Sequence, residues 1–283
     1  MPEYYRAFYL LDQLHADALF QFLPPNYYES SGFSLVIALH GGGGSAEQFE
    51  STSRLSDKAN SAKFIVVYPE GVQSNGLIKA GTWNAGSCCD YAAEQNINNV
   101  KFIKALIDRL VSAFKVNAKK VYATGHSNGG MMAYRLACEI PDKIAAIATN
   151  GCTMVTASCN PNKPVPILHM HSELDKNVPY QGGPGDGIGT RGLVFNFIVA
   201  VMDGWSLRNN CTNKAQVVVN DTNYKLTTWT NCSGNVTLKY YLTKDGGHAW
   251  PGGLPGSVMG DNPSKVINAN NLIWDFFQQY QLP

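Results

Sequence analysis

Short, continuous runs of apolar residues alternate along this chain with longer stretches in which apolar residues recur every three or four positions. The short runs predict strands, most of them buried on both faces, at residues 34–39, 64–68, 119–124, 143–149, 165–171 and 237–242. Residues 96–114 carry Ile103, Ile107, Leu110 and Phe114 at helical spacing and predict an amphipathic helix. Strands that alternate with helices imply right-handed crossovers, so we predict an α/β fold with a mainly parallel central sheet and helices on both faces.

The two ends of the chain and one internal stretch predict further elements. Residues 5–11 and 16–23 are apolar-rich and predict an antiparallel pair at one edge of the sheet. Asn262-Pro263 predicts the start of a final helix. Residues 181–192 are rich in glycine and predict a surface loop. Internal repeats and linkers are not visible, so we expect residues 1–283 to form a single catalytic domain.

The segment Gly125-His126-Ser127-Asn128-Gly129 fits the G-x-S-x-G pattern, in which a strand turns sharply into a helix with a serine at the apex. The apex backbone is strained, and glycine on either side removes the Cβ that would clash. The predicted strand at 119–124 and a predicted helix at 131–140 flank the segment in the required order. We therefore predict Ser127 as a nucleophile rather than an incidental serine in a glycine-rich turn.

A serine nucleophile needs a base, and in this arrangement the chain order is serine, acid, histidine. Of the six histidines, only His169, His171 and His248 follow Ser127. The first two lie within or at the end of a predicted strand, with little room for an acid before them. His248 lies in a glycine-flanked loop after the strand at 237–242, where it could reach the nucleophile. We predict His248 as the base.

The acid that orients the base should lie between the nucleophile and His248. Asp175 follows the strand at 165–171 by four residues, which places it at the carboxyl edge of the sheet, where active sites gather in open α/β folds. Glu173 is the nearest rival and Asp203 a more distant one. We predict Asp175 as the acid.

The negative oxygen formed during acyl transfer needs two preorganised N–H donors. One is expected from Asn128, directly after the nucleophile at a helix N-terminus. The other is expected from the glycines after His40, at Gly41 or Gly42, and we assign Gly42. This glycine run lacks the sequence patterns of phosphate-binding loops. His40 itself is expected to fix the loop by hydrogen bonding.

Composition narrows the class of protein. Of the 283 residues, 45% are hydrophobic and 15% charged, which suits a compact enzyme. The formal charge of +1 gives no reason to expect nucleic acid or an acidic membrane as a partner. The apolar runs are all shorter than the ~20 residues that span a bilayer. The first residues show no signal peptide, although one could have been removed before residue 1.

Seven cysteines favour an oxidising compartment, and hence a secreted or periplasmic protein. Cys211 and Cys232 bracket a polar stretch that would suit a disulfide loop. Cys152 and Cys159 flank a second short loop. The spacing lacks the repeated C-x-x-C of a zinc site, so we expect no metal. An odd count leaves at least one thiol free, and several cysteines could instead be small buried hydrophobes.

Five separated motifs resemble the esterase/polyhydroxybutyrate depolymerase family, which includes feruloyl and acetyl-xylan esterases and belongs to the α/β-hydrolases. They lie at residues 40–49, 83–89, 125–132, 175–183 and 246–253. The resemblance implies an α/β-hydrolase fold, Ser127 as nucleophile, Asp175 as acid and His248 as base. It departs from the family at Asn98-Asn99, where paired aspartates are common, and at Ser172, where a glycine is common.

These observations favour a serine carboxyl-ester hydrolase that works through an acyl-enzyme without metal or organic cofactor. Its substrate would be a small-molecule, polysaccharide-linked or polyester ester, such as a feruloyl ester or polyhydroxybutyrate. Trp83, Tyr180 and Trp250 lie near the motifs and are expected to bind an apolar or aromatic part of it, although core packing is the alternative for each. A prolyl-type serine peptidase and a non-catalytic binding module on a hydrolase scaffold remain alternative functions.

Overall fold

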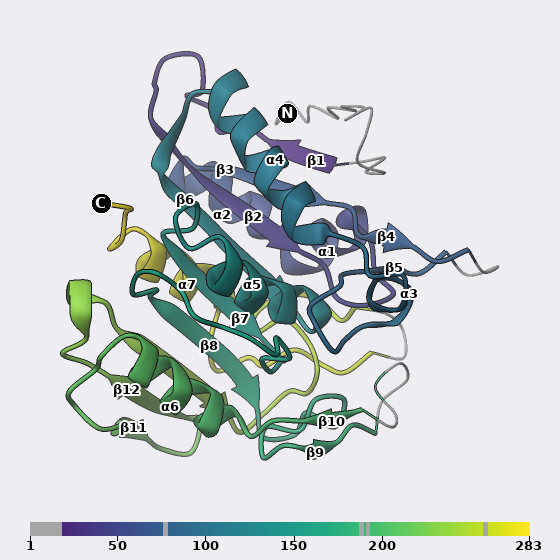
Figure 1. Ribbon diagram of the computed structural model, residues 1–283, viewed down its shortest axis with the longest axis vertical. Coiled ribbons are helices and arrows are strands. Elements are labelled where there is room, and N and C mark those ends of the chain that lie inside the picture. The colour runs from purple at the N-terminus through teal and green to yellow at the C-terminus, as the bar shows by residue number, and fades with distance from the viewer. Residues whose placement is uncertain (1–18, 76–78, 187–189, 191–192, 257–259) are drawn as a thin grey trace.

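The fold is organised around a nine-stranded sheet with the strand order β1-β3-β2-β6-β7-β8-β13-β12-β11 (Figure 1). The computed structural model describes residues 19–75, 79–186, 190, 193–256 and 260–283. The strands of this sheet are β1 (Leu19–Phe22), β2 (Phe33–Leu39), β3 (Ile65–Pro69), β6 (Val116–His126), β7 (Ala146–Asn150), β8 (Ile167–Ser172), β11 (Gln216–Asn220), β12 (Tyr224–Trp229) and β13 (Leu238–Thr243). The six central strands run parallel, while β1, β12 and β11 pair antiparallel at the two edges.

Helices cover both faces of the sheet and bury a separate apolar cluster on each (Figure 1). One face carries α4 (Asn99–Ala113), α5 (Asn128–Glu139) and α6 (Ile198–Arg208), and the other carries α1 (Ala46–Ser53), α2 (Leu55–Ala62) and α7 (Ala269–Phe277). Residues of β2 alternate between the clusters, with Ile37 in the first and Val36 in the second. A strand that is apolar on both faces reads as a continuous apolar run, which is why β2 was predictable.

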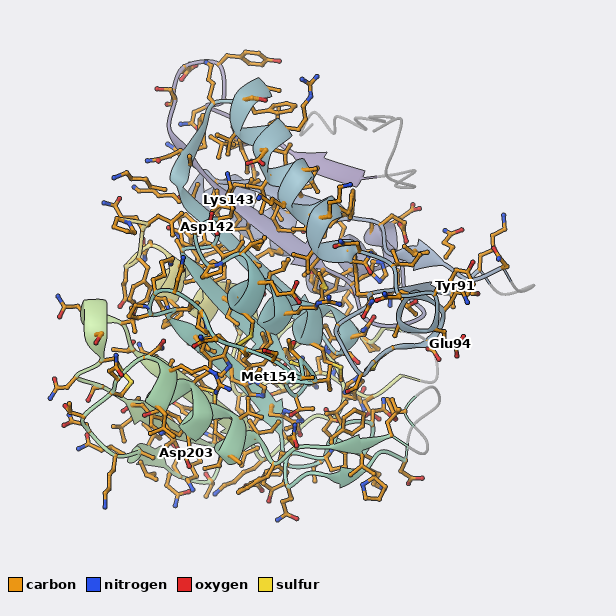
Figure 2. The ribbon with its side chains drawn as sticks, viewed as in Figure 1. Tyr91, Glu94, Asp142, Lys143, Met154 and Asp203 are labelled. Atoms are coloured by element: carbon orange, nitrogen blue, oxygen red, sulfur yellow. A yellow bond between two sulfur atoms is a disulfide. The ribbon has the colours of Figure 1, made fainter. Side chains whose placement is uncertain are left out.

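Smaller elements border the carboxyl end of the sheet. They are α3 (Asp90–Glu94) and two antiparallel ribbons, β4 (Val72–Gln73) with β5 (Gly81–Thr82), and β9 (Gly183–Pro184) with β10 (Val194–Phe195). The 3₁₀ turn η1 (Ser233–Asn235) lies at the opposite end, between β12 and β13. Helix α6 is tied to the sheet by Asp203, which accepts a hydrogen bond from Trp229 Nε1 of β12 at 2.8 Å (Figure 2).

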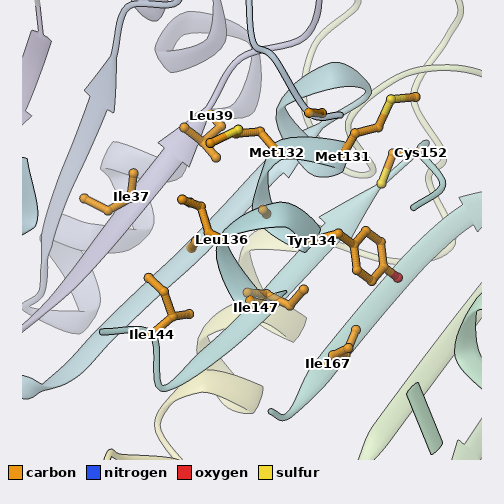
Figure 3. Close-up of a cluster of buried hydrophobic side chains, with 14 of the residues drawn as sticks. Ile37, Leu39, Met131, Met132, Tyr134, Leu136, Ile144, Ile147, Cys152 and Ile167 are labelled. Atoms are coloured by element: carbon orange, nitrogen blue, oxygen red, sulfur yellow. The ribbon is translucent and has the colours of Figure 1, made fainter. Parts of the chain in front are cut away.

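The centre of the first cluster lies under α5. Met132 of α5 lies beside Leu39 of β2, and Leu136 lies between Ile37 and Ile147 of β7 (Figure 3). Tyr134 lies on the side of Ile167 of β8. These side chains are fully buried. The helix that follows Ser127 is thereby held rigidly on the middle of the sheet.

Most of the predicted elements are confirmed, including every central strand and the helices at 96–114 and 131–140. The predicted start of the last helix at Asn262-Pro263 is wrong. Helix α7 begins at Ala269, because Asn268 caps it by accepting a hydrogen bond from the Asn271 N–H. Asp245 meanwhile holds Ser264 and Lys265 in a loop.

The remaining predictions for the chain ends and the glycine-rich stretch are met in part. Residues 5–11 lie outside the described residues, and residues 19–22 form β1, which pairs with β3. Within 181–192, Gly183 and Pro184 pair with β10 instead of forming only a loop. The rest of that stretch is described only in part.

Three disulfides occur in the described part of the chain, and the Cys211–Cys232 bridge is confirmed. Cys159 pairs with Cys138 of α5, and Cys88 pairs with its neighbour Cys89. Cys152 is the free, buried thiol that the odd count required. Within the described ranges, every helix falls short of the length and apolar character that crossing a bilayer requires.

Candidate active site

Ser127 lies at the apex of a sharp turn between β6 and α5, with φ 53° and ψ −123°. The turn forces close backbone contacts on both sides. A Cβ on Gly125 would lie 2.4 Å from the Gly129 carbonyl carbon, and a Cβ on Gly129 would lie 2.2 Å from the Leu39 oxygen. Any side chain at either place would collide with backbone, so this conformation requires both glycines.

Ser127, His248 and Asp175 form one continuous line of hydrogen bonds. His248 Nε2 lies 2.9 Å from Ser127 Oγ, and His248 Nδ1 lies 2.7 Å from Asp175 Oδ2. The three residues come from the carboxyl ends of β6, β13 and β8, which the parallel sheet brings to one edge. The Asp175 side chain is 1% exposed and that of His248 is 10% exposed.

The Asp175 carboxylate is held in a charged state. Burial by itself raises its pKa, but the His248 charge and the hydrogen bonds from His171 and His248 outweigh burial and hold the pKa well below its usual range. The Val178 N–H also donates to Oδ1 at 2.9 Å. An ionised acid beside His248 is the state that orients an imidazole and stabilises its protonated form.

Neither rival acid occupies this position. Asp203 lies on α6, where it binds Trp229 (Figure 2). Glu173 is exposed to solvent. A different carboxylate, that of Asp261, accepts a hydrogen bond from the His248 backbone N–H at 2.7 Å and so anchors the histidine loop. Sequence reasoning missed Asp261, because only the folded loop brings it back to His248.

His40 fixes the glycine loop, as the sequence indicated. Gly71 N–H donates to His40 Nε2 at 2.9 Å, so the ring proton lies on Nδ1, which donates to the Gly41 oxygen at 2.8 Å. Burial lowers the pKa of His40 to about 4, which keeps the ring neutral. The N–H groups of Gly43 and Gly44 are already bonded, to the Gly81 and Gly41 oxygens.

Gly42 and Asn128 lie next to each other across the site, since a Cβ on Gly42 would lie 3.5 Å from the Asn128 Cβ. The Asn128 side chain has an additional structural task that the sequence did not reveal. Its amide clamps the Trp83 backbone in both directions, accepting from the Trp83 N–H at 2.7 Å and donating to the Trp83 oxygen at 2.9 Å. This pair ties residues 83–89 to the start of α5.

The three aromatic candidates do not share one position. Trp83 is fully buried, and its indole N–H donates to the His40 oxygen at 3.0 Å, so it lies in the framework under the glycine loop. Trp250 is 3% exposed, packs edge-on against Phe49 and borders the cavity beside Ser127. Tyr180 is half-buried against the first apolar cluster and is absent from the described lining of that cavity.

The cavity beside Ser127 has a volume of about 550 Å³. The apolar side chains of its wall include Phe49 and Leu254. The polar side chains of its wall include Gln48, Gln73 and Lys79. Among the described residues, His, Cys, Asp and Glu side chains form no group that could hold a metal ion.

His126 is a further wall residue that the sequence analysis treated only as a variable position of the motif. Its ring lies 4.6 Å from the His248 ring, and its Nδ1 lies 2.9 Å from Asn150 Nδ2. Burial, with the charge of His248 as a second cause, lowers the pKa of His126 to about 3. It is therefore a neutral neighbour of His248.

This sheet, with its strand-turn-helix serine and the loops at its carboxyl edge, defines an α/β-hydrolase fold. The sequence profile of the phospholipase/carboxylesterase family matches residues 29–184, more than half of the chain. The chain therefore belongs to the phospholipase/carboxylesterase family.

Individual relatives agree with this assignment. Feruloyl esterase B of Piromyces equi is 28% identical over 265 residues, which cover 92% of this chain and 44% of that protein. The putative esterase NocK of Nocardia uniformis subsp. tsuyamanensis is 31% identical over 238 residues, which cover 78% of this chain and 67% of that protein. The chain thus spans less than half the length of the Piromyces protein.

Solved structures support the fold. The acetyl xylan esterase from Aspergillus awamori superposes with a TM-score of 0.63 at 16% identity, over 87% of this chain and 94% of that one. The Bacillus cereus carboxylesterase gives a TM-score of 0.58 at 13% identity, over 93% of this chain and 96% of that one. Identities this low bear on the fold alone.

Proposed function

We propose that this protein is a serine carboxyl-ester hydrolase that forms an acyl-enzyme on Ser127. The observation that carries the proposal is the unbroken line of hydrogen bonds from Ser127 Oγ through the His248 ring to Asp175 Oδ2. Membership of the phospholipase/carboxylesterase family supports the same reaction class.

In the first half-reaction, His248 Nε2 takes the proton from Ser127 Oγ as that oxygen attacks the ester carbonyl carbon. A bond forms between Oγ and the acyl carbon, and the carbonyl oxygen becomes negatively charged. His248 then gives its proton to the departing alkoxide while the ester C–O bond breaks. Asp175 stays ionised throughout and stabilises the imidazolium.

The backbone N–H groups of Asn128 and Gly42 are the proposed donors to the negative oxygen. Asn128 directly follows Ser127 and Gly42 lies beside Asn128, while the N–H groups of Gly43 and Gly44 are already engaged elsewhere. Losing one such donor typically costs about 3 kcal/mol of transition-state stabilisation. His40 acts through the loop, because its bonds to Gly41 and Gly71 hold the loop against the start of α5.

In the second half-reaction, His248 takes a proton from water, and the resulting hydroxide attacks the acyl carbon. The bond to Oγ breaks, the acid leaves and Ser127 regains its proton from His248. Apart from the attacking water, these steps use only side chains and backbone N–H groups.

The cavity supports an ester that joins an apolar acyl part to a polar alcohol. Phe49, Trp250 and Leu254 can cover an apolar group, while Gln48 and Gln73 can bind hydroxyl groups. The names of the relatives, feruloyl esterase and acetylxylan esterase, point to plant polysaccharide esters as the class to test. A hydroxybutyrate polyester is the other candidate. We also propose a secreted or periplasmic location, because three disulfides suit an oxidising compartment.

The test is hydrolysis of p-nitrophenyl acetate and butyrate, methyl ferulate, acetylated xylan and a hydroxybutyrate oligomer by the wild type and by Ser127→Ala. We expect wild-type turnover of at least one ester and a loss of roughly 10⁴-fold or more in the variant. Ser112→Ala on the exposed side of α4 is the matched control and should keep wild-type rates. Unchanged activity in Ser127→Ala would overturn the proposal.

A further inference from the structure

Behind the candidate acid lies a buried chain of polar side chains that the proposed reaction does not use. We propose that His171 is a positioning residue for Asp175, and that a hydrogen-bond chain from α5 and β7 through His169 holds His171 in that role. The inference rests on the proposed function of Ser127, His248 and Asp175.

The chain begins with two histidines on one strand. His169 and His171 are alternate residues of β8, so their side chains lie on the same face of the sheet. Their rings are stacked with centroids 5.4 Å apart, and His169 Nε2 lies 3.1 Å from His171 Nδ1. The two residues are 0% and 2% exposed.

The oxygen of Val178 determines the direction of the chain. A carbonyl oxygen can only accept, and it lies 2.7 Å from His171 Nε2, so that nitrogen carries a proton. The same nitrogen lies 3.3 Å from Asp175 Oδ2. His171 thus keeps a proton-bearing nitrogen beside the carboxylate regardless of the charge of its ring.

If the His171 ring is neutral, the donor and acceptor roles of the other ring nitrogens in the chain can be assigned. Its Nδ1 is then an acceptor, so His169 must donate from Nε2 and accept at Nδ1. One of two neighbouring hydroxyl groups donates to the single lone pair of that acceptor, either Tyr134 Oη of α5 at 2.8 Å or Thr149 Oγ1 of β7 at 2.9 Å. Burial holds the pKa of His169 well below its usual range, which agrees with a neutral ring.

The end of the chain meets the proposed catalytic atoms. His171 Nε2 and His248 Nδ1 converge on the same oxygen, Asp175 Oδ2, while Val178 N–H occupies Oδ1. Without His171, Oδ2 would be held by His248 alone, and the carboxylate would lose one of its three restraints while the imidazole gains and loses its proton. His171 therefore keeps the carboxylate plane fixed, and it helps a buried carboxylate remain ionised.

A matched pair of amide variants tests the role. The glutamine amide nitrogen of His171→Gln reaches the place of Nε2, whereas that of His171→Asn reaches only the place of Nδ1. We expect kcat within about fivefold of wild type for His171→Gln and roughly 10- to 100-fold lower for His171→Asn, with KM nearly unchanged in both. Equal losses in the two variants, or wild-type kcat in His171→Asn, would overturn the proposal.

The pH profile separates positioning from a general structural defect. Loss of the His171 donor leaves Asp175 more basic, so it binds the His248 imidazolium more strongly, and the acid limb of kcat/KM should move to higher pH only in His171→Asn. Titratable groups that face this cluster come from each neighbouring element: His126 of β6, Tyr134 of α5, Cys152 after β7, His169 of β8 and Tyr240 of β13. An unmoved acid limb in His171→Asn would count against positioning.

A third measurement needs no variant. Nitrogen-15 NMR of histidine-labelled wild type should show His171 with its proton on Nε2, and a proton on Nδ1 alone would overturn the proposal. Ser127→Ala tests the reaction separately, because its activity would survive if the triad were wrongly assigned, whatever the state of His171.

Discussion

The parallel half of the sheet, from β3 to β13, and its antiparallel half, β12 and β11, differ in how deeply their residues are buried. In β3, β7 and β8 every residue is buried, whereas β11 has four exposed residues of five. The parallel strands carry the candidate site at their carboxyl ends, and the antiparallel extension of β12 and β11 carries the Cys211–Cys232 bridge. Chemistry that needs fixed distances is thus built where packing on both faces leaves side chains no freedom.

The largest difference in stability is expected between Gly→Ala substitutions at two helical glycines, one at the start of α5 and one in α6. Gly129→Ala in α5 would place a Cβ 2.2 Å from the Leu39 oxygen, which neither backbone can avoid. We expect a loss of more than about 4 kcal/mol in unfolding free energy, or no folded protein. Gly204→Ala in α6 meets only the end of the Arg208 side chain at 2.9 Å, and should be neutral or stabilise by up to about 1 kcal/mol.

Urea unfolding of both variants, read by circular dichroism, measures this contrast. Hydrolysis by Gly204→Ala should stay at the wild-type rate, because α6 lies away from Ser127. A stable, active Gly129→Ala protein would show that the turn at Ser127 is looser than its contacts indicate.

Replacing one valine by threonine on each of two strands should produce a smaller difference in stability. Val67 in β3 is fully buried, and Val217 in β11 is 52% exposed. Val67→Thr buries a hydroxyl among apolar side chains and should cost about 1–3 kcal/mol. Val217→Thr should change stability by less than about 0.5 kcal/mol. Thermal unfolding of the two variants checks the difference, and equal costs would remove the distinction between the two halves.

The smallest expected effect comes from pH, and it arises in the parallel half. Burial keeps His40, His126 and His169 neutral in the folded protein, with pKa values below the ordinary value near 6.5. The unfolded chain therefore binds more protons as the pH falls, so stability decreases on acidification. From pH 7 to pH 6 each of these histidines contributes about 0.7 kcal/mol.

Urea titrations at pH 8, 7 and 6 give this slope directly. Little change is expected between pH 8 and 7, where both states of the protein hold neutral histidines. A stability that rises toward pH 6 would mean that one of these rings is charged in the folded protein.

Sequence patterns located the parallel half well and the antiparallel half poorly. Continuous apolar runs predicted β2, β3, β7 and β8, because a strand covered on both faces has no polar side to interrupt the run. Strands β11 and β12 escaped, since their residues are largely exposed or half-exposed and their sequence resembles a polar loop. Helix α7 was placed too early because a Pro after an Asn imitates a helix start, whereas Asn268 is the residue that caps it.

Within the candidate site, too, sequence patterns located some residues and missed others. The roles of Ser127, Asp175 and His248 stay predictions, but their sequence context located residues that the fold brings within hydrogen-bond distance. The aromatic candidates were less informative, because Trp83 and Trp250 are both buried and only the fold shows that Trp250 borders the cavity. Asp261 had no sequence signal at all.

The sequence by itself determined the order of the strands along the chain, the glycines that permit the turn at Ser127 and the chemical types available for catalysis. These depend on local sterics and on periodicity, which neighbouring residues settle among themselves. Only the tertiary structure decided which carboxylate faces His248, that His171 and His169 line up behind it, and that Asn128 clamps Trp83. The contacts of His248 with Asp175 and of Asn128 with Trp83 join residues tens of positions apart, and hydrogen bonds between distant side chains leave no periodic trace in the chain.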